Sequence, residues 1–205
     1  MSSSTTAGTD PSAILARAVE QAVLAPSSHN TQPWLFRIDG ESLELYADRA
    51  RGLRVNDPDD RELTVSCGAA LLNARVAAEH AGAALEVELL PDGDGGDLLA
   101  RARLAGGSSA DARLFAAIAD RRTYRRPFSD RAVPADALAR LEEAAAAEGA
   151  WLDVLDGRRR AELVSLVAEG DRTQFADPRW RRELASWMRS RRAGDGLALP
   201  RLAAP

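Results

Sequence analysis

Residues 25–34 read Ala25-Pro26-Ser27-Ser28-His29-Asn30-Thr31-Gln32-Pro33-Trp34. The stretch follows an apolar-periodic segment and leads into an alternating one at residues 35–38, so it joins a predicted helix to a predicted strand. Its two inner prolines fix φ and remove two backbone donors, which restrains the polar residues between them. A restrained polar loop at such a junction predicts a ligand-binding site. The same composition is also typical of a helix stop followed by a plain turn.

The pattern Pro-Ser-x-x-Asn-x-Gln-Pro-Trp resembles the signature of the nitroreductase family of flavin enzymes. The residues that carry it are Pro26, Ser27, Asn30, Gln32, Pro33 and Trp34. The continuation at residues 57–62 and 66–70 is similar to the Acg-like branch, whose members carry two degenerate nitroreductase repeats in one chain. The resemblance runs from about Ile14 to about Gly196.

Length and composition describe an ordinary globular chain. Its 205 residues suffice for one domain, or for two small ones sharing a core, and 45% of them are hydrophobic. No window is long and apolar enough for a transmembrane helix, and residues 1–6 lack the basic and apolar regions of a signal peptide. We therefore expect a cytoplasmic protein that does not contact a membrane, with residues 1–11 as a disordered lead.

The charge pattern argues against nucleic-acid binding, because the net charge is −4 and the positive residues are dispersed. All 27 positive side chains are Arg, so an anion site must use guanidinium groups, which suit phosphate. Cys67 is the single cysteine, which excludes an intrachain disulfide, and we expect a packed thiol. His29 and His80 have no ligand-spaced Cys or Asp pattern, so no metal site is predicted.

Periodicity predicts an α+β fold. Helical spacing covers residues 12–25, 61–80, 111–120, 134–148, 159–169 and 178–191, and strand patterns cover residues 34–38, 43–47, 85–89, 99–104 and 151–155. Turn signals at Asp39-Gly40 and at residues 91–96 join neighbouring strands, which predicts antiparallel pairs. We expect a largely antiparallel sheet flanked by helices, with the helix at residues 61–80 buried at the centre.

The resemblance implies two unequal repeats. Residues 12–106 would form the first and residues 110–193 a partial second one, followed by a loose tail at residues 194–205. The second repeat has the expected helix and Trp151 with its strand, but residues 147–150 replace the polar loop. Because it stops after its opening helices, we expect exposed apolar surface and self-association.

A basic run begins at Arg121. Composition alone is typical of a solvated face, whereas nitroreductases use a similar run to hold the phosphate and pyrimidine edge of FMN. The residues that match are Arg121, Arg122, Thr123 and Arg125, and Arg125 is the candidate cation near N1 and O2 of the flavin. The other half of the site would come from the first repeat, through Ser27, Ser28, Asn30 and Gln32. One chain would then assemble one complete site from complementary halves.

The resemblance therefore implies an FMN-dependent oxidoreductase that passes hydride from NAD(P)H through flavin to a small-molecule substrate. No protein residue is expected to be catalytic, because hydride transfer belongs to the cofactor. The alternative is a flavin-binding or flavin-sequestering protein with little or no turnover. A third reading is a degenerate scaffold that no longer binds flavin.

Overall fold

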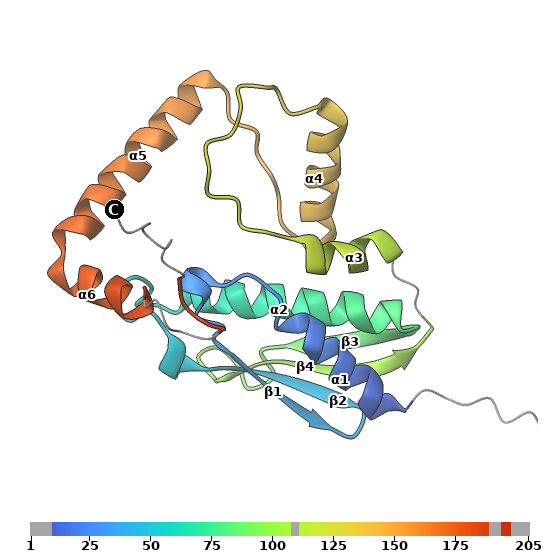
Figure 1. The fold of residues 1–205 in the computed structure, drawn as a ribbon. Coiled ribbons are helices and arrows are strands. Elements are labelled where there is room, and N and C mark those ends of the chain that lie inside the picture. The colour runs from blue at the N-terminus through green and yellow to red at the C-terminus, as the bar shows by residue number, and fades with distance from the viewer. Residues whose placement is uncertain (1–9, 108–110, 189–193, 198–205) are drawn as a thin grey trace, which may run out of the picture. The chain divides into compact units, whose positions relative to one another are not determined.

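The computed structural model describes residues 10–107, 111–188 and 194–197. They fall into two compact units, one comprising the described residues up to Thr123 together with those from Arg179 onward, and the other Tyr124–Pro178. The first unit holds the sheet and most of the buried side chains. Figure 1 shows the elements in chain order.

The sheet has four strands, β1 (Trp34–Asp39), β2 (Ser42–Ala47), β3 (Ala83–Leu89) and β4 (Leu98–Gly106). Their spatial order is β1-β2-β4-β3, and every neighbouring pair is antiparallel. Gly40 turns the chain between β1 and β2 with φ at +58°, a conformation that glycine adopts without a Cβ penalty. The predicted antiparallel pairing at both turn signals is confirmed.

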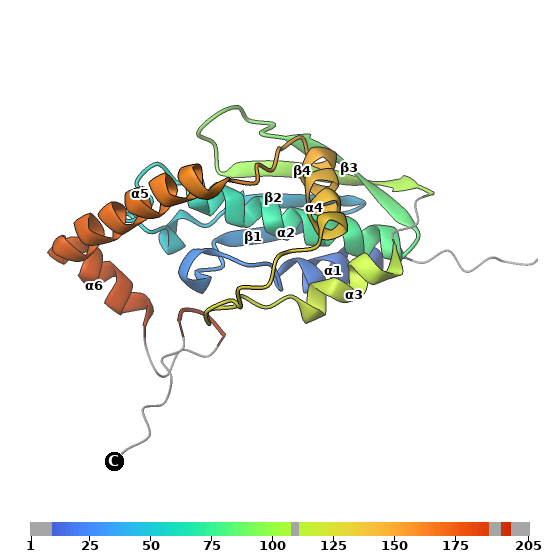
Figure 2. The ribbon, with the colours of Figure 1, turned by 90° about the horizontal axis from the view of Figure 1, so that it is seen from above.

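Two helices cover one face of this sheet, α1 (Pro11–Ala22) and α2 (Arg61–His80) (Figures 1 and 2). Asp10 caps α1, since its carboxylate accepts from the Ser12 amide at 3.1 Å. The core lies between the helices and the inward side chains of the strands. Its largest fully buried members are Leu15, Pro33, Leu43, Leu45 and Cys67.

Helix α2 is the buried centre of the unit, with the bounds that its periodicity predicts. The side it turns inward carries mostly small residues, including Cys67, Ala70 and Ala74, each 0% exposed. Small side chains let the neighbouring elements approach closely, and α2 contacts α1, α3 and strands β2 and β3. The α+β prediction with a central buried helix is therefore confirmed.

The opposite face of the sheet carries a line of alternating charges, one on each strand. Arg37 on β1 lies 3.6 Å from Glu44 on β2, and Glu44 lies 3.1 Å from Arg101 on β4. Arg101 in turn lies 3.7 Å from Glu88 on β3. Opposite charges on cross-strand partners stabilise the register, and a charged face is suited to water. The core is thus restricted to the helix-covered side.

Two further helices belong wholly or mostly to the first unit, α3 (Ala112–Asp120) and α6 (Pro178–Trp187). The ring of Phe115 on α3 stacks on His80 with centroids 3.9 Å apart. Helix α6 is anchored by Trp180, which is buried and donates from Nε1 to Asn56 Oδ1 at 2.8 Å. Glu183 accepts from the amides of both Val55 and Asn56, at 3.0 and 2.9 Å. These contacts secure α6 to the loop that precedes α2.

The second unit contains α4 (Ala135–Ala147) and α5 (Gly157–Ala176). Neither helix has a buried residue, and α5 exposes Leu163, Val164, Leu166, Val167 and Phe175. Apolar surface of this kind accords with the expected self-association, which stays a prediction.

The expected strand at residues 151–155 is wrong. These residues form no strand, and Trp151 is 88% exposed. An alternating segment becomes a strand only where a neighbouring edge pairs with its backbone, and none of the described strands pairs with this segment. The helix expected at residues 159–169 is longer, because α5 runs from Gly157 to Ala176. Asp156 caps its start by accepting from the Arg159 amide at 2.8 Å.

The predictions for both ends of the chain fall partly outside the described residues. Residues 1–9 of the expected lead, residues 189–191 of the last expected helix and residues 198–205 of the expected tail all lie there. The division into a whole and a partial repeat stays a prediction. Within the described part of the chain, no helix is both long and apolar enough to span a bilayer.

Candidate functional site

The loop at residues 27–32, called the motif loop below, has a strained backbone. It contains a short 3-10 turn, η1 (Ser28–Asn30), and three of its non-glycine residues have positive φ: His29 at 50°, Asn30 at 54° and Gln32 at 52°. Such conformations cost about 1–3 kcal/mol each and persist only where the surroundings enforce them. Three strained residues within positions 29–32 mark this loop as a functional candidate.

Local hydrogen bonds hold the motif loop in this shape. The Ser27 hydroxyl accepts from the Gln32 amide at 2.9 Å, and the Ser27 carbonyl accepts from the Asn30 amide at 2.9 Å. The Ser28 carbonyl accepts from the Thr31 amide at 3.0 Å, and Thr31 is only 2% exposed. The turn is therefore closed on itself from both ends.

Helix α2 supports the motif loop from below. Ser28 donates from its hydroxyl to Glu62 at 2.5 Å and from its amide to the Ser66 hydroxyl at 3.4 Å. The Cys67 thiol donates to the Pro33 carbonyl at 3.2 Å. Burial raises the pKa of that thiol to about 12, so Cys67 stays protonated and is a packing residue rather than a nucleophile. The expected packed thiol is what the structure shows.

Arg51 brings a cation to the motif loop. It is the last residue of the 3-10 turn η2 (Arg49–Arg51). Asp48 caps this turn by accepting from the Ala50 amide at 3.1 Å. One Arg51 nitrogen, Nη1, donates to the Thr31 carbonyl at 3.0 Å, and Nε lies 3.4 Å from an Asp48 oxygen. The guanidinium is thereby aimed along the edge of the motif loop.

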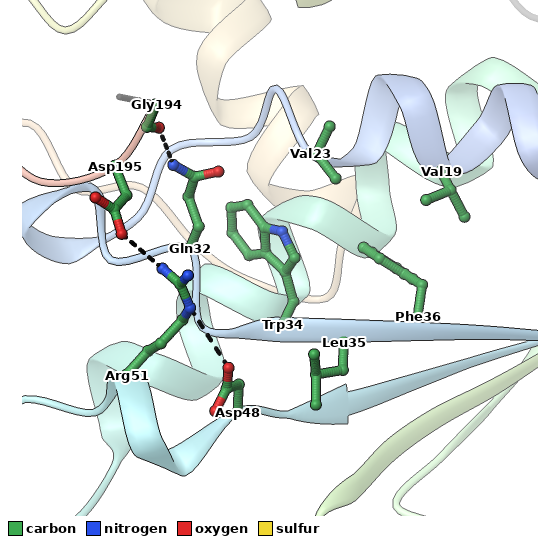
Figure 3. Close-up of a pocket in the computed structure, with 10 residues that line it drawn as sticks. All are labelled: Val19, Val23, Gln32, Trp34, Leu35, Phe36, Asp48, Arg51, Gly194 and Asp195. Atoms are coloured by element: carbon green, nitrogen blue, oxygen red, sulfur yellow. Dashed lines mark hydrogen bonds and ion pairs between the residues drawn. The ribbon is translucent and has the colours of Figure 1, made fainter. Parts of the chain in front are cut away.

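A cavity of about 590 Å³ opens beside Gln32 and Arg51. Figure 3 shows its two sides, with Val19, Val23, Trp34 and Phe36 forming an apolar wall and the polar groups gathered opposite. Ligand sites commonly pair a large apolar surface with a few placed polar groups. This cavity has that character.

Residues 194–197, called the strap below, lie across the polar side. Gln32 donates from Nε2 to the Gly194 carbonyl, and Arg51 donates to an Asp195 oxygen at 3.0 Å (Figure 3). Asn30 donates from Nδ2 to the Gly196 carbonyl at 3.2 Å and accepts from the Gly196 amide at 3.0 Å. The amides predicted to face flavin are thus paired with the backbone of the same chain.

His29 in the motif loop has a buried Nδ1 without a hydrogen-bond partner among the described residues. Desolvation lowers the pKa of His29, against smaller opposing effects of the Glu62 and Glu183 carboxylates. The imidazole is therefore neutral near neutral pH. Within the described residues, no cluster of three or more His, Cys, Asp or Glu side chains could hold a metal ion.

The predicted basic residues are exposed. Arg121 donates to the carbonyl of Leu24 at 3.4 Å, beside the turn that leads into the motif loop, and approaches Thr123 Oγ1 at 3.5 Å. Arg122 bonds back to the carbonyls of Ala119 and Arg121. Arg125 belongs to the second unit. The composite site formed with the motif loop stays a prediction.

Sequence reasoning missed Arg51 and the strap. The signal for Arg51 was its place shortly after a predicted strand, at the end of the turn η2. The signal for the strap was Gly194-Asp195-Gly196, whose glycines have φ of +91° and +75°. Two glycines flanking one residue allow a turn that no other residue type forms easily.

No family model matches the chain. Several curated proteins do. The chain is 38% identical over 181 residues to "Putative NAD(P)H nitroreductase Rv3131" of Mycobacterium tuberculosis (strain ATCC 25618 / H37Rv), covering 87% of this chain and 52% of that protein. It is 31% identical over 193 residues to "Putative NAD(P)H nitroreductase acg" of the same strain, covering 90% and 56%. For "Probable NAD(P)H nitroreductase PigM" of Serratia sp. (strain ATCC 39006) the identity is 29% over 203 residues, covering 93% and 56%.

A solved nitroreductase family protein from Streptococcus pneumoniae TIGR4 aligns with a TM-score of 0.35 and 18% identity, over 62% of this chain and 92% of that chain. At that level the likeness supports no further statement. Over the part that it spans, the chain is similar in sequence to proteins named as NAD(P)H nitroreductases. Its relatives include Acg, so the resemblance carried by residues 26–34 is confirmed. The chain spans about half the length of the curated relatives it matches.

Proposed function

We propose that this chain is an FMN-dependent oxidoreductase of the nitroreductase type, which takes hydride from NAD(P)H and passes it to a small-molecule acceptor. The observation that carries the proposal is the motif loop, whose strained backbone directs the Gln32 amide to the rim of a cavity walled by Trp34 and Phe36. The relatives named NAD(P)H nitroreductases support the same reaction type.

The residues present fit a flavin. The cavity volume of about 590 Å³ lies in the range of small-molecule sites, and its apolar wall suits a planar ring. Gln32 and Asn30 offer amide donors, and Ser27 keeps its hydroxyl proton for a ligand because it acts as an acceptor toward Gln32. A bound flavin would supply the hydride chemistry, so the chain needs no nucleophile or acid–base pair of its own.

The residues of this chain would bind, orient and shield. Ser27, Ser28, Asn30 and Gln32 would hold the cofactor from the first unit, and Arg121, Arg122, Thr123 and Arg125 would bind its phosphate and pyrimidine edge. Guanidinium groups suit both tasks, because phosphate is an anion and a nearby cation makes flavin reduction easier. Trp34, Val19 and Val23 would exclude water from the ring.

The proposal is tested by titrating FMN into the purified protein and following flavin fluorescence. Arg121→Ala and Arg125→Ala should each weaken FMN binding about 10- to 150-fold, as expected for hydrogen bonds to charged groups. Arg131→Ala removes an exposed arginine outside the motif and should change the affinity little. Equal affinities for all three variants would show that the basic run is only a solvated face.

The second candidate is a flavin-binding or flavin-sequestering protein with little turnover. The strap favours it, because a covered site is suited to storage. Mixing FMN-loaded protein with NADPH under anaerobic conditions separates the two. Bleaching of the yellow colour within seconds supports the oxidoreductase, whereas flavin that stays bound and oxidised supports sequestration.

A further inference from the structure

We propose that Asn30, Gln32 and Arg51 form one subsite that recognises a ring imide, and that the strap occupies this subsite until a ligand displaces it. The proposal rests on the proposed function for the identity of the ligand, but its structural part has a readout that needs no flavin.

The contacts of the strap define what the subsite recognises. Gln32 donates to the Gly194 carbonyl, and the Asn30 side chain donates to the Gly196 carbonyl. The main-chain carbonyl of Asn30 accepts from the Gly196 amide, which lies between those two carbonyls in sequence. Two donors and one acceptor are complementary to a group that offers two carbonyls and an N–H, which is the composition of a cyclic imide. The pyrimidine ring of a flavin carries such a group in O2, N3–H and O4, which leaves N1 to the cation proposed at Arg125.

Arg51 adds a positive charge to this set. It donates to an Asp195 carboxylate oxygen at 3.0 Å, so an oxygen acceptor of a ligand can take the place of that carboxylate. Phosphate also suits a guanidinium, but it has no N–H to offer and would set its oxygens against the Asn30 carbonyl. The imide therefore fits the three groups better than phosphate does.

The strap is held by contacts and conformations that can be released. Gly196 is buried and has φ of +75°, and the Leu197 amide bonds to the Trp187 carbonyl at 2.8 Å. A β-branched side chain at such a φ is strongly disfavoured. Gly196→Val should therefore open the strap without touching Asn30, Gln32 or Arg51.

The chain contains a matched control. The loop between β3 and β4 carries the same tripeptide, Gly93-Asp94-Gly95, and its glycines have φ of +81° and +89°. Gly95→Val and Asp94→Ala thus introduce the same strain and the same charge loss as Gly196→Val and Asp195→Ala, in a loop outside the cavity lining.

The first measurement is amide hydrogen exchange in the full chain without ligand. Gly196→Val should speed exchange at positions 196 and 197 by about 5- to 30-fold. This factor corresponds to the cost of about 1–2 kcal/mol for a non-glycine residue in the left-handed conformation. Asp195→Ala should act in the same direction by about two- to fivefold, because the ion pair with Arg51 is partly exposed. The two control variants should leave exchange at these positions unchanged.

The second measurement is the affinity for FMN and for riboflavin, which lacks the phosphate. If flavin binds only when the strap is open, the apparent affinity is the intrinsic affinity multiplied by the fraction of open molecules. Amide exchange at the strap depends on the same fraction, so the gain in flavin affinity should equal the gain in exchange rate. Both flavins should gain by the same factor, because they share the imide.

The outcomes separate the two proposals. Unchanged exchange in Gly196→Val would overturn the strap. Faster exchange without a gain in affinity, or a gain confined to FMN, would overturn the imide subsite and leave flavin binding intact. Faster exchange combined with no flavin binding by any variant would overturn the proposed function, while the exchange result would uphold the strap.

Discussion

Replacing Asp57 by alanine removes the carboxylate that caps α2. Asp57 is 6% exposed, and its Oδ2 accepts from the Leu63 amide at 2.9 Å, in the first turn of the helix. The change leaves a buried N–H unpaired and removes a negative charge from the positive end of the helix dipole. We expect a loss of roughly 2–4 kcal/mol, from about 1.5–3 for the charge-assisted bond and about 0.3–1 for the dipole.

Urea unfolding followed by circular dichroism measures this loss. The midpoint should fall with an unchanged m-value, and Tm should fall by about 2–4 °C for each kcal/mol. Asp57→Asn keeps an acceptor and should lose about half as much. Asp59→Ala removes an exposed carboxylate two residues away and should stay within about 0.5 kcal/mol of the original protein. An Asp57→Ala protein as stable as Asp59→Ala would refute the capping role.

Three further predictions concern the core and the titrating groups. Native Cys67 should resist thiol reagents, and since its pKa rises from 9.0 to about 12 on folding, stability should fall between these pH values. The stability of Cys67→Ala should lack this decrease with pH, which amounts to at most about 1.4 kcal/mol per pH unit. Because folding lowers the pKa of His29, neutral His29 contributes to the stability of the folded protein above pH 6.5. That contribution is lost as the pH falls through the pKa of His29 in the folded state. His29→Asn, which tolerates the positive φ, should lose less stability on acidification. Leu45→Ala should cost about 2–5 kcal/mol in urea unfolding, because Leu45 is 2% exposed.

Each of these has a result that counts against it. Rapid labelling of native Cys67 would contradict the buried thiol. An identical acid transition in His29→Asn would show that other groups cause it. Leu35 is 54% exposed, and Leu35→Ala should change stability by no more than about 0.5 kcal/mol, so a loss equal to that of Leu45→Ala would contradict the one-sided core.

Local patterns by themselves determined most of the fold of the first unit. The bounds of α2 follow from its 3- and 4-residue spacing, and the strand pairs follow from alternation joined by turns such as Asp39-Gly40. These features depend on residues close together in sequence. The same reasoning failed at residues 151–155, because a strand needs a partner edge that local alternation does not supply.

The sequence also determined the motif loop, since the prolines on either side of it and its serines and amides are contiguous and match a family signature. The convergence of Arg51 and the strap on that loop was decided by tertiary structure. Arg51 reaches Thr31 from 20 residues away, and the Gly196 carbonyl reaches Asn30 from 166 residues away. Such contacts arise from how α6 and η2 pack against the rest of the unit, and no local periodicity or turn preference encodes them.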